Sequence, residues 1–266
     1  NIESFHRVSA KNSQGIIPFT REIKNSIQKL EHVGKKLPKV WIDIRNDLEK
    51  LNLNYINYNY YLEICKNRGL DVNQSNVFCK DYHNLGVFLS FQDNIILKDT
   101  IFLKPEWATN AVYKLLDSRI VVESFGSFSY QMLQSIWKEY PRDKHSVLIE
   151  LLKKFELCFE LGNSMSYIIP ELLSPSQTNF ARNNFETNPS YIYKYEFMPS
   201  GIINRLIVRL HTLINESQYW KNGLIIKWKE HSTALIIAEP LKRKISIFLN
   251  KNVQLLCIIL SLIIIY

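Results

Sequence analysis

The spacing of hydrophobic residues changes along this chain, and the change strongly constrains its fold. From residue 16 to residue 155, apolar side chains recur mainly every three or four positions, which is the period of helices that bury one face. Beyond residue 190, several segments alternate apolar and polar residues or form short apolar runs between polar turns, as antiparallel strands do. The chain is therefore predicted to be α+β, with a helical part first and a smaller part of one helix and an antiparallel sheet second.

The helical part is predicted to contain a series of amphipathic helices, two short strands at 87–91 and 101–103, and a closing hairpin. The inward helix positions lie within residues 19–30, 41–51, 58–65, 77–85, 105–116, 132–137 and 147–155. Leu157, Phe159 and Leu161 alternate with polar or small residues, which predicts a half-buried strand that turns at 162–164 and returns through 167–169. Helices, a short sheet and a terminal hairpin have the outline of a winged helix.

A polar segment at 174–190, rich in Asn, Ser, Thr and Pro, is predicted to be a linker. A strand with Tyr191, Tyr193, Tyr195 and Phe197 on one face follows it, and then a helix over 202–213. Three further strands are predicted at 223–228, 233–238 and 244–249, separated by short polar turns as in a meander.

Composition and net charge do not by themselves indicate a binding partner. The chain has 266 residues and a formal net charge of +8, but its lysines are scattered and no basic run exceeds Lys242-Arg243-Lys244. The four cysteines form no C-x-x-C pair, so we expect reduced, packed thiols in a cytoplasmic protein rather than a zinc site or disulfides. The six histidines are dispersed without an H-E-x-x-H pattern, and no metal is expected.

Catalytic motifs are missing from the sequence. It contains no G-x-x-x-x-G-K-[ST] loop to cradle phosphates, no D-x-x-G, no N-K-x-D and no kinase signature. We therefore expect this chain to have no catalytic residues and no cofactor of its own.

A series of short motifs, in a fixed order, resembles the Roco family. Ser9-Ala10-Lys11 resembles the loop of a small GTPase that contacts the guanine base, and the preceding residues are expected to form its last strand. The later motifs resemble the COR (C-terminal of Roc) region, and they lie at residues 37–49, 83–87, 103–114, 154–159 with 167–170, 197–207 and 219–223.

This resemblance implies a domain plan and a function. Residues 1–34 would be the closing strand and helix of the Roc GTPase domain, 35–174 a winged-helix-like COR-A, 175–190 a linker and 191–266 a truncated COR-B. The parent would bind GTP or GDP through Roc, and some family members carry a serine/threonine kinase domain after COR. The chain would couple the nucleotide state of Roc to docking and homodimerisation in signalling. Candidate interface residues are Trp107, Tyr113, Arg205, Tyr219 and Trp220.

Two other readings follow from the residues. A winged helix could bind nucleic acid, but the candidate recognition helix at 129–140 carries only Lys138 against Glu139, so nucleic acid is not the expected partner. The tail at 255–266 is wholly apolar where the family has an amphipathic helix. At about 1.5 Å per residue it is too short to cross a hydrocarbon core of roughly 30 Å, so we interpret it as a truncated or misread gene end and expect no membrane partner.

Overall fold

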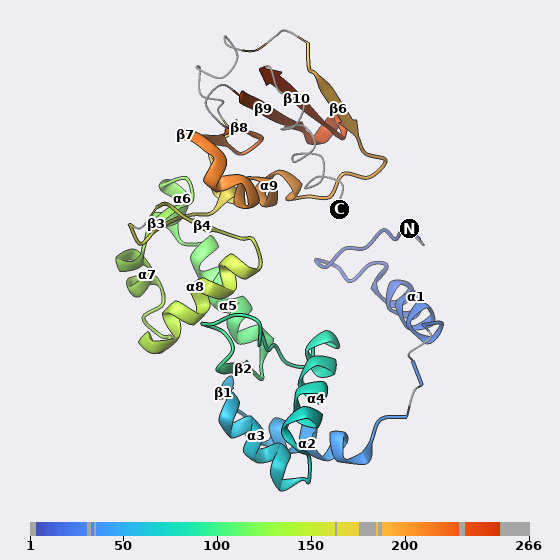
Figure 1. Ribbon diagram of the computed structural model, residues 1–266. Coiled ribbons are helices and arrows are strands. Elements are labelled where there is room, and N and C mark those ends of the chain that lie inside the picture. The colour runs from blue at the N-terminus through green and yellow to red at the C-terminus, as the bar shows by residue number, and fades with distance from the viewer. Residues whose placement is uncertain are drawn as a thin grey trace. The chain divides into compact units, whose positions relative to one another are not determined.

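The computed structural model describes residues 4–30, 33–34, 36–162, 164–175, 185, 188–228 and 232–250. The chain divides into two compact units (Figure 1). One comprises Asn1–Asn52 with Leu62–Phe78, and the other comprises Leu53–Tyr61 with Cys79–Tyr266. The predicted linker lies largely outside the described residues, and the apolar tail at 255–266 lies wholly outside them.

The first unit is helical. It contains α1 (Ile16–Gln28), α2 (Lys39–Lys50) and most of α3 (Tyr58–Asn67) and α4 (Val72–Asn84). The amide of Gln74 donates to the Asp71 carboxylate and the Asp71 amide donates to the Gln74 side chain, a reciprocal cap that starts α4. Helix α2 buries Ile44 and Leu48, and Trp41 meets the Phe78 ring edge-on at 5.4 Å.

Helix α1 differs from these helices because it buries none of its side chains. Its apolar stripe has the predicted spacing, yet Ile23, Ile27 and Leu30 are 41–47% exposed. The strand expected before Ser9 is not formed among described residues 4–8, where no ladder partner pairs with the backbone. The described chain therefore covers this apolar stripe only in part, with the His6 ring 5.3 Å from the Phe19 ring.

The second unit begins with a helical half, which we define as residues 53–61 and 79–173. In chain order it contains β1 (Tyr55–Asn57), β2 (Thr100–Phe102), α5 (Pro105–Leu116), α6 (Arg119–Glu123), β3 (Ser127–Ser129), α7 (Tyr130–Ile136), α8 (His145–Lys154), β4 (Phe159–Glu160) and β5 (Ser166–Ile168), with 3-10 turns at Arg142–Lys144 and Pro170–Leu172. Helices α5, α7 and α8 supply a large part of its core, including Ala111, Leu115, Leu133 and Leu148, and Trp137 just after α7 is buried with them.

The small strands of this half differ from the prediction. The strand expected at 87–91 is reduced to a single bridge between Leu89 and Phe102. Strand β2 pairs instead with β1, in the register Tyr55 opposite Phe102 and Asn57 opposite Thr100. Strands β1 and β3 and helix α6 were not predicted, because elements of three to five residues are too short to show a hydrophobic period.

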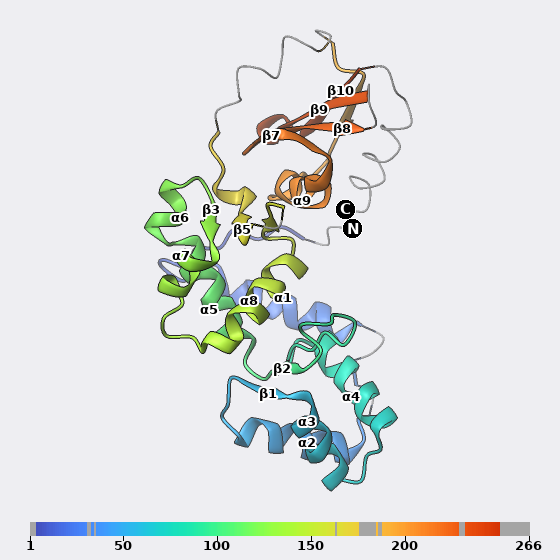
Figure 2. The same cartoon turned by 60° about the vertical axis from the view of Figure 1, so that its left-hand side comes forward.

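The sheet half, residues 188–250, contains β6 (Tyr191–Lys194), α9 (Ile202–Leu210), β7 (Ile214–Trp220), β8 (Gly223–Trp228), β9 (Ser232–Glu239) and β10 (Lys244–Asn250), with 3-10 turns at His211–Leu213 and Pro240–Lys242. The strands form one antiparallel sheet in the order β6-β10-β9-β8-β7 (Figure 2). Helix α9 covers one face through Ile203, Leu206, Ile207 and Leu210. On the other face Trp220, Ile225, Leu235 and Phe248 are buried.

The predicted α+β class is confirmed by this arrangement. The helix over 202–213 and the strands at β8, β9 and β10 match their predicted positions closely, whereas β7 was not predicted. Across the part of the chain that the structure describes, no helix is both long and apolar enough to cross a bilayer.

Candidate functional site

The hairpin of β4 and β5 belongs to two hydrophobic cores at once. Phe159 and Ile168 stand directly opposite each other in the ladder and pack into the core of the sheet half. Their neighbours Cys158 and Tyr167 pack into the core of the helical half. Because successive side chains of a strand point to opposite faces, each face of this shared hairpin, residues 158–169, is covered by a different core. The prediction of a half-buried strand is therefore wrong, since both faces are buried.

Aromatic contacts extend the shared hairpin into the sheet half. The ring of Phe159, only 4% exposed, stacks on His211 at 5.1 Å and meets Tyr219 edge-on at 5.8 Å. Leu173, which follows the hairpin, is also part of the sheet-half core. Tyr219, one of the predicted interface residues, thus contacts the other half of its own chain.

Two polar contacts join the halves beside these apolar ones. Arg209 on α9 donates through Nε to a Glu156 carboxylate oxygen at 2.6 Å, and the side chains are 25% and 26% exposed. Glu156 follows α8 in a left-handed conformation, with φ of 57°. Asn204, also on α9, donates to Glu171 just after β5. Helix α9 is therefore held to the helical half at two points along its length.

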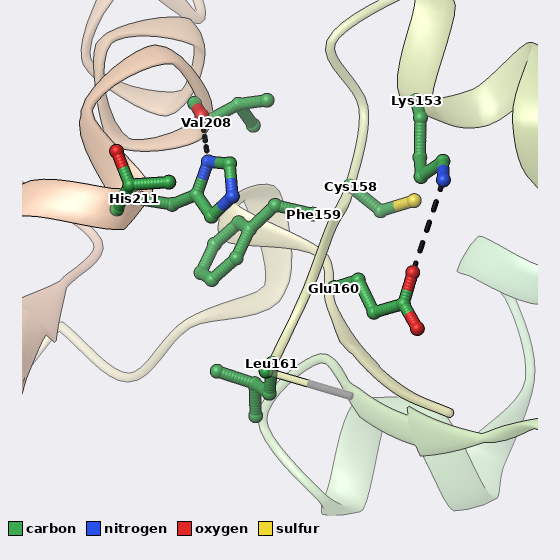
Figure 3. A pocket seen from close by; sticks show the side chains of 9 residues that line it. Lys153, Cys158, Phe159, Glu160, Leu161, Val208 and His211 are labelled. Atoms are coloured by element: carbon green, nitrogen blue, oxygen red, sulfur yellow. Dashed lines mark hydrogen bonds and ion pairs between the residues drawn. The ribbon is translucent and has the colours of Figure 1, made fainter. Parts of the chain in front are cut away.

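A cavity of about 680 Å³ lies where the shared hairpin faces the end of α9 (Figure 3). The His211 ring is fixed there because its Nδ1 lies 2.7 Å from the Val208 carbonyl oxygen, a contact in which only the nitrogen can donate. Lys153 pairs with Glu150 at 2.9 Å and with Glu160 at 3.8 Å. Burial disfavours the charged form of the Lys153 amine, but the hydrogen bond and the negative charge of Glu150 outweigh it and raise the pKa of Lys153.

The cavity does not assemble a nucleophile with a base. Burial raises the pKa of the Cys158 thiol to about 12, so the thiol stays protonated and unreactive near neutral pH. Within the described ranges, no three His, Cys, Asp or Glu side chains gather in a way that could hold a metal ion. The arrangement supports packing and mechanical connection between the two halves.

Of the other predicted interface residues, Trp107, Tyr113 and Trp220 lie apart from the shared hairpin, whereas Arg205 lies beside it. Trp107 is half-buried between the rings of Tyr55 and Tyr140, each 5.1 Å away, and Tyr113 is 57% exposed on α5. Arg205, exposed on α9, lines a smaller cavity together with Glu156 and Ile169, so it lies where the two halves meet. Trp220 is 4% exposed, and its indole lies over the backbone of Gly223. A side chain at position 223 would overlap that indole, which explains the glycine three residues after the tryptophan.

The loop of Ser9, Ala10 and Lys11 is compact. The Ser9 amide donates to the Gln14 carbonyl at 3.0 Å, and Gly15 has φ of 74°. A Cβ on Gly15 would collide with the carbonyl of Arg7, so the loop requires glycine there. Ala10 and Lys11 are exposed.

The fold defines a class of two-part module in which a helical half and a sheet half share one hairpin. The family model described as C-terminal of Roc, COR-A domain matches residues 38–173, and the one described as C-terminal of Roc, COR-B domain matches residues 186–263. The chain therefore belongs to the COR family of Roco proteins.

Curated relatives and a solved structure agree with this assignment. A Roc-COR-CHAT protease of Runella zeae is 26% identical over 87% of this chain and 27% of its own length. The probable serine/threonine-protein kinase pats1 of Dictyostelium discoideum is 26% identical over 88% of this chain and 8% of its own length. The Methanosarcina barkeri Roco2 RocCORdC structure bound to GDP matches with a TM-score of 0.53 and 33% identity, over 65% of this chain and 55% of that one. The chain thus spans 27% of the length of the first of these two curated relatives and 8% of the second.

Proposed function

We propose that this chain is a non-catalytic coupling module that links the GTP or GDP state of an adjacent Roc domain to docking and homodimerisation in signalling. The observation that carries the proposal is the shared hairpin. Because Phe159 and Ile168 belong to one core and Cys158 and Tyr167 to the other, the helical half cannot shift against the sheet half without opening a core. A displacement imposed on one half is therefore passed to the other.

The partly exposed apolar stripe of α1 supports an adjacent G domain as the partner. Ile23, Ile27 and Leu30 form an apolar face that the described chain covers only in part. The preceding Ser9-Ala10-Lys11 loop has the tight backbone that a guanine-contacting loop requires. We propose that a Roc domain covers α1 and holds the nucleotide, and that the larger parent is a GTPase acting in the cytoplasm. The GDP-bound RocCOR relative and the kinase-containing relative are consistent with that larger architecture.

The test is to purify this chain and the matching GTPase domain and to measure their association by calorimetry with GDP and with a slowly hydrolysed GTP analogue. A coupling module should show affinities that differ between the nucleotides by about fivefold or more. Ile23→Asp with Ile27→Asp should abolish the association, whereas Ile120→Asp, an isoleucine 53% exposed on α6, should not. Absence of binding in every nucleotide state would contradict the proposal.

Homodimerisation through the sheet half needs its own test. Strand β6 lies at one edge of the sheet, and Tyr191 and Ile192 on it are 37% and 41% exposed. Exposed apolar edge strands are sites of chain pairing. Sedimentation equilibrium of the chain should detect a dimer that Ile192→Asp weakens and that Ile95→Asp, at an 82% exposed position in the helical half, leaves intact.

Nucleic-acid binding is not favoured by this structure. The helix that precedes the hairpin is α8, not the segment at 129–140 that the sequence suggested as a recognition helix. Helix α8 buries His145, Val147, Leu148, Ile149, Leu151 and Leu152, and so has little free surface for a groove. Lys153, on the part of α8 that remains accessible, is engaged by Glu150 and Glu160.

A further inference from the structure

One corner of the sheet half gathers exposed apolar side chains and cations. It lies where β9 ends, β10 begins and β6 ends, and we call residues 194–197 with 240–244 the basic corner. The Tyr195 amide donates to the Arg243 carbonyl at 2.8 Å, and the Arg243 guanidinium donates to the Glu196 carbonyl at 3.0 Å. These two hydrogen bonds hold the segment after β6 against the turn between β9 and β10.

Leu241 is the most exposed large apolar residue in the described chain. It sits in the one-turn helix Pro240–Lys242 and is 101% exposed, so neighbouring atoms cover essentially none of it. Phe197, on the other segment of the corner, is 62% exposed. Leu241 contributes no burial to the fold and Phe197 contributes little, although exposing two large apolar side chains at one tight corner is unfavourable in water.

The cationic side chains around Leu241 and Phe197 lie close enough to repel one another. Lys194 on β6 stands directly opposite Lys244 on β10, and like charges in that relation destabilise a sheet. Glu239 offsets part of this repulsion, because its carboxylate accepts from Lys242 and from Lys244 at 2.7 Å each. Those hydrogen bonds lower the pKa of Glu239 and keep it ionised. With Arg243, the corner has four cationic side chains against the carboxylates of Glu196 and Glu239.

We propose that the basic corner docks on an anionic phospholipid surface. A convex turn with a fully exposed leucine suits a fluid interface, where the side chain enters between headgroups without needing a matched socket. The ring of lysine and arginine side chains complements the negative charge of such a surface. A protein partner would have to supply a pocket that fits Leu241 and Phe197 together. Docking of this kind needs no helix that spans the bilayer.

Cosedimentation of the 266-residue chain with vesicles tests the proposal. The chain should bind vesicles of phosphatidylcholine with phosphatidylserine and should not bind vesicles of phosphatidylcholine alone. Raising salt from about 0.1 M to about 0.5 M should release it, because the screening length falls well below the size of the corner. Absence of binding to the anionic vesicles would overturn the proposal.

Substitutions locate the contact. Leu241→Gln with Phe197→Ser should weaken vesicle binding about tenfold through the lost apolar insertion. Lys194→Gln with Lys242→Gln should weaken it to a similar extent, since each basic residue near an anionic surface contributes comparably. The matched controls are Phe125→Ser, at a 58% exposed position in the helical half, and Lys98→Gln; neither should change binding.

These positions are exposed, so the variants should remain folded, and circular dichroism should show unfolding midpoints not markedly below that of the parent. Equal loss in the control variants would mean that general charge or hydrophobicity drives adsorption, and the proposal would fail. Unchanged vesicle binding in the corner variants, with altered sedimentation of the free chain, would identify the corner as a contact with a second copy and would equally reject a lipid surface.

Discussion

Arg209 and Glu156 form an ion pair of 2.6 Å that joins the sheet half to the helical half, with each side chain about three-quarters buried. At this depth the pair is less screened by solvent than a surface salt bridge. Removing one partner leaves the other charge partly desolvated beside the shared hairpin.

Substitution of Arg209 by Gln should therefore destabilise the second unit by about 1–3 kcal/mol, because the Glu156 carboxylate would lose its 2.6 Å contact with the guanidinium. Glu156→Gln should have a similar cost. The double variant should lose less than the sum of the single losses, which denaturant unfolding in a double-mutant cycle would measure. Strictly additive losses would mean that the two side chains do not interact in solution.

Phe159→Ala should separate the unfolding of the two halves. Truncating a phenylalanine with 4% exposure costs about 3–5 kcal/mol, and here the lost contacts belong to the core that joins the halves. Calorimetry should show a single transition for the parent second unit and two for the variant. Phe128→Ala, at a position 1% exposed within the helical core, is the matched control and should lower stability without splitting the transition. A single transition in Phe159→Ala would refute the connecting role of the hairpin.

Tyr195 should make the sheet half sensitive to alkali. Burial, with a smaller contribution from Tyr193, raises the pKa of Tyr195 to about 12 from its usual value of about 10. Above pH 10 the unfolded state releases this proton before the folded state does, so stability falls as pH rises toward the folded pKa. Tyr195→Phe should retain more of its neutral-pH stability at pH 11 than the parent.

The hydroxyl of Tyr195 is buried and has no hydrogen-bond partner within the described residues. The free energy of unfolding of the phenylalanine variant at neutral pH should consequently equal that of the parent or exceed it by up to about 1 kcal/mol. Unfolding curves recorded at neutral and alkaline pH check both points. Tyr191→Phe, at an exposed position on the preceding strand β6, should follow the parent at each pH.

Gly223→Ala should disrupt the far face of the sheet. Its methyl group would overlap the Trp220 indole and lie 2.6 Å from the Ile236 carbonyl oxygen. Overpacking of this kind costs about 1–3 kcal/mol, which thermal unfolding would register as a lowered midpoint. Trp220→Leu introduced with Gly223→Ala should recover part of the loss. If Gly223→Ala left the midpoint unchanged, the placement of Trp220 over Gly223 would be wrong.

The longer elements could be predicted from hydrophobic period alone. Helix α9 is an example, since Ile203, Leu206, Ile207 and Leu210 define one face and all are buried against the sheet. Strands β8 and β9 were equally clear, as apolar runs between polar turns. These segments have enough residues for a period to emerge, and their burial follows from a single core.

The shared hairpin could not be predicted in the same way. Glu160 made the segment look half-polar, whereas Cys158 and Phe159 are both buried, each in a different core. The near-continuous apolar run at 157–159 was the available signal, because a strand covered on both faces loses its alternation. Contacts such as Arg209 with Glu156 join residues 53 positions apart, and no local pattern encodes them. The interface roles proposed for Trp107, Tyr113, Arg205, Tyr219 and Trp220 stay predictions.

The polar segment after residue 173 looks like a natural place to divide the chain and to express the sheet half alone. Such a fragment would lack Phe159, Ile168 and Leu173, which fill its interior from the far side of the cut. Apolar side chains of α9 would then be exposed to solvent, and the fragment would aggregate or bind nonspecifically. Each half needs the hairpin to complete its core. The smallest part that can fold by itself is therefore defined by this packing and not by the polar segment between the halves.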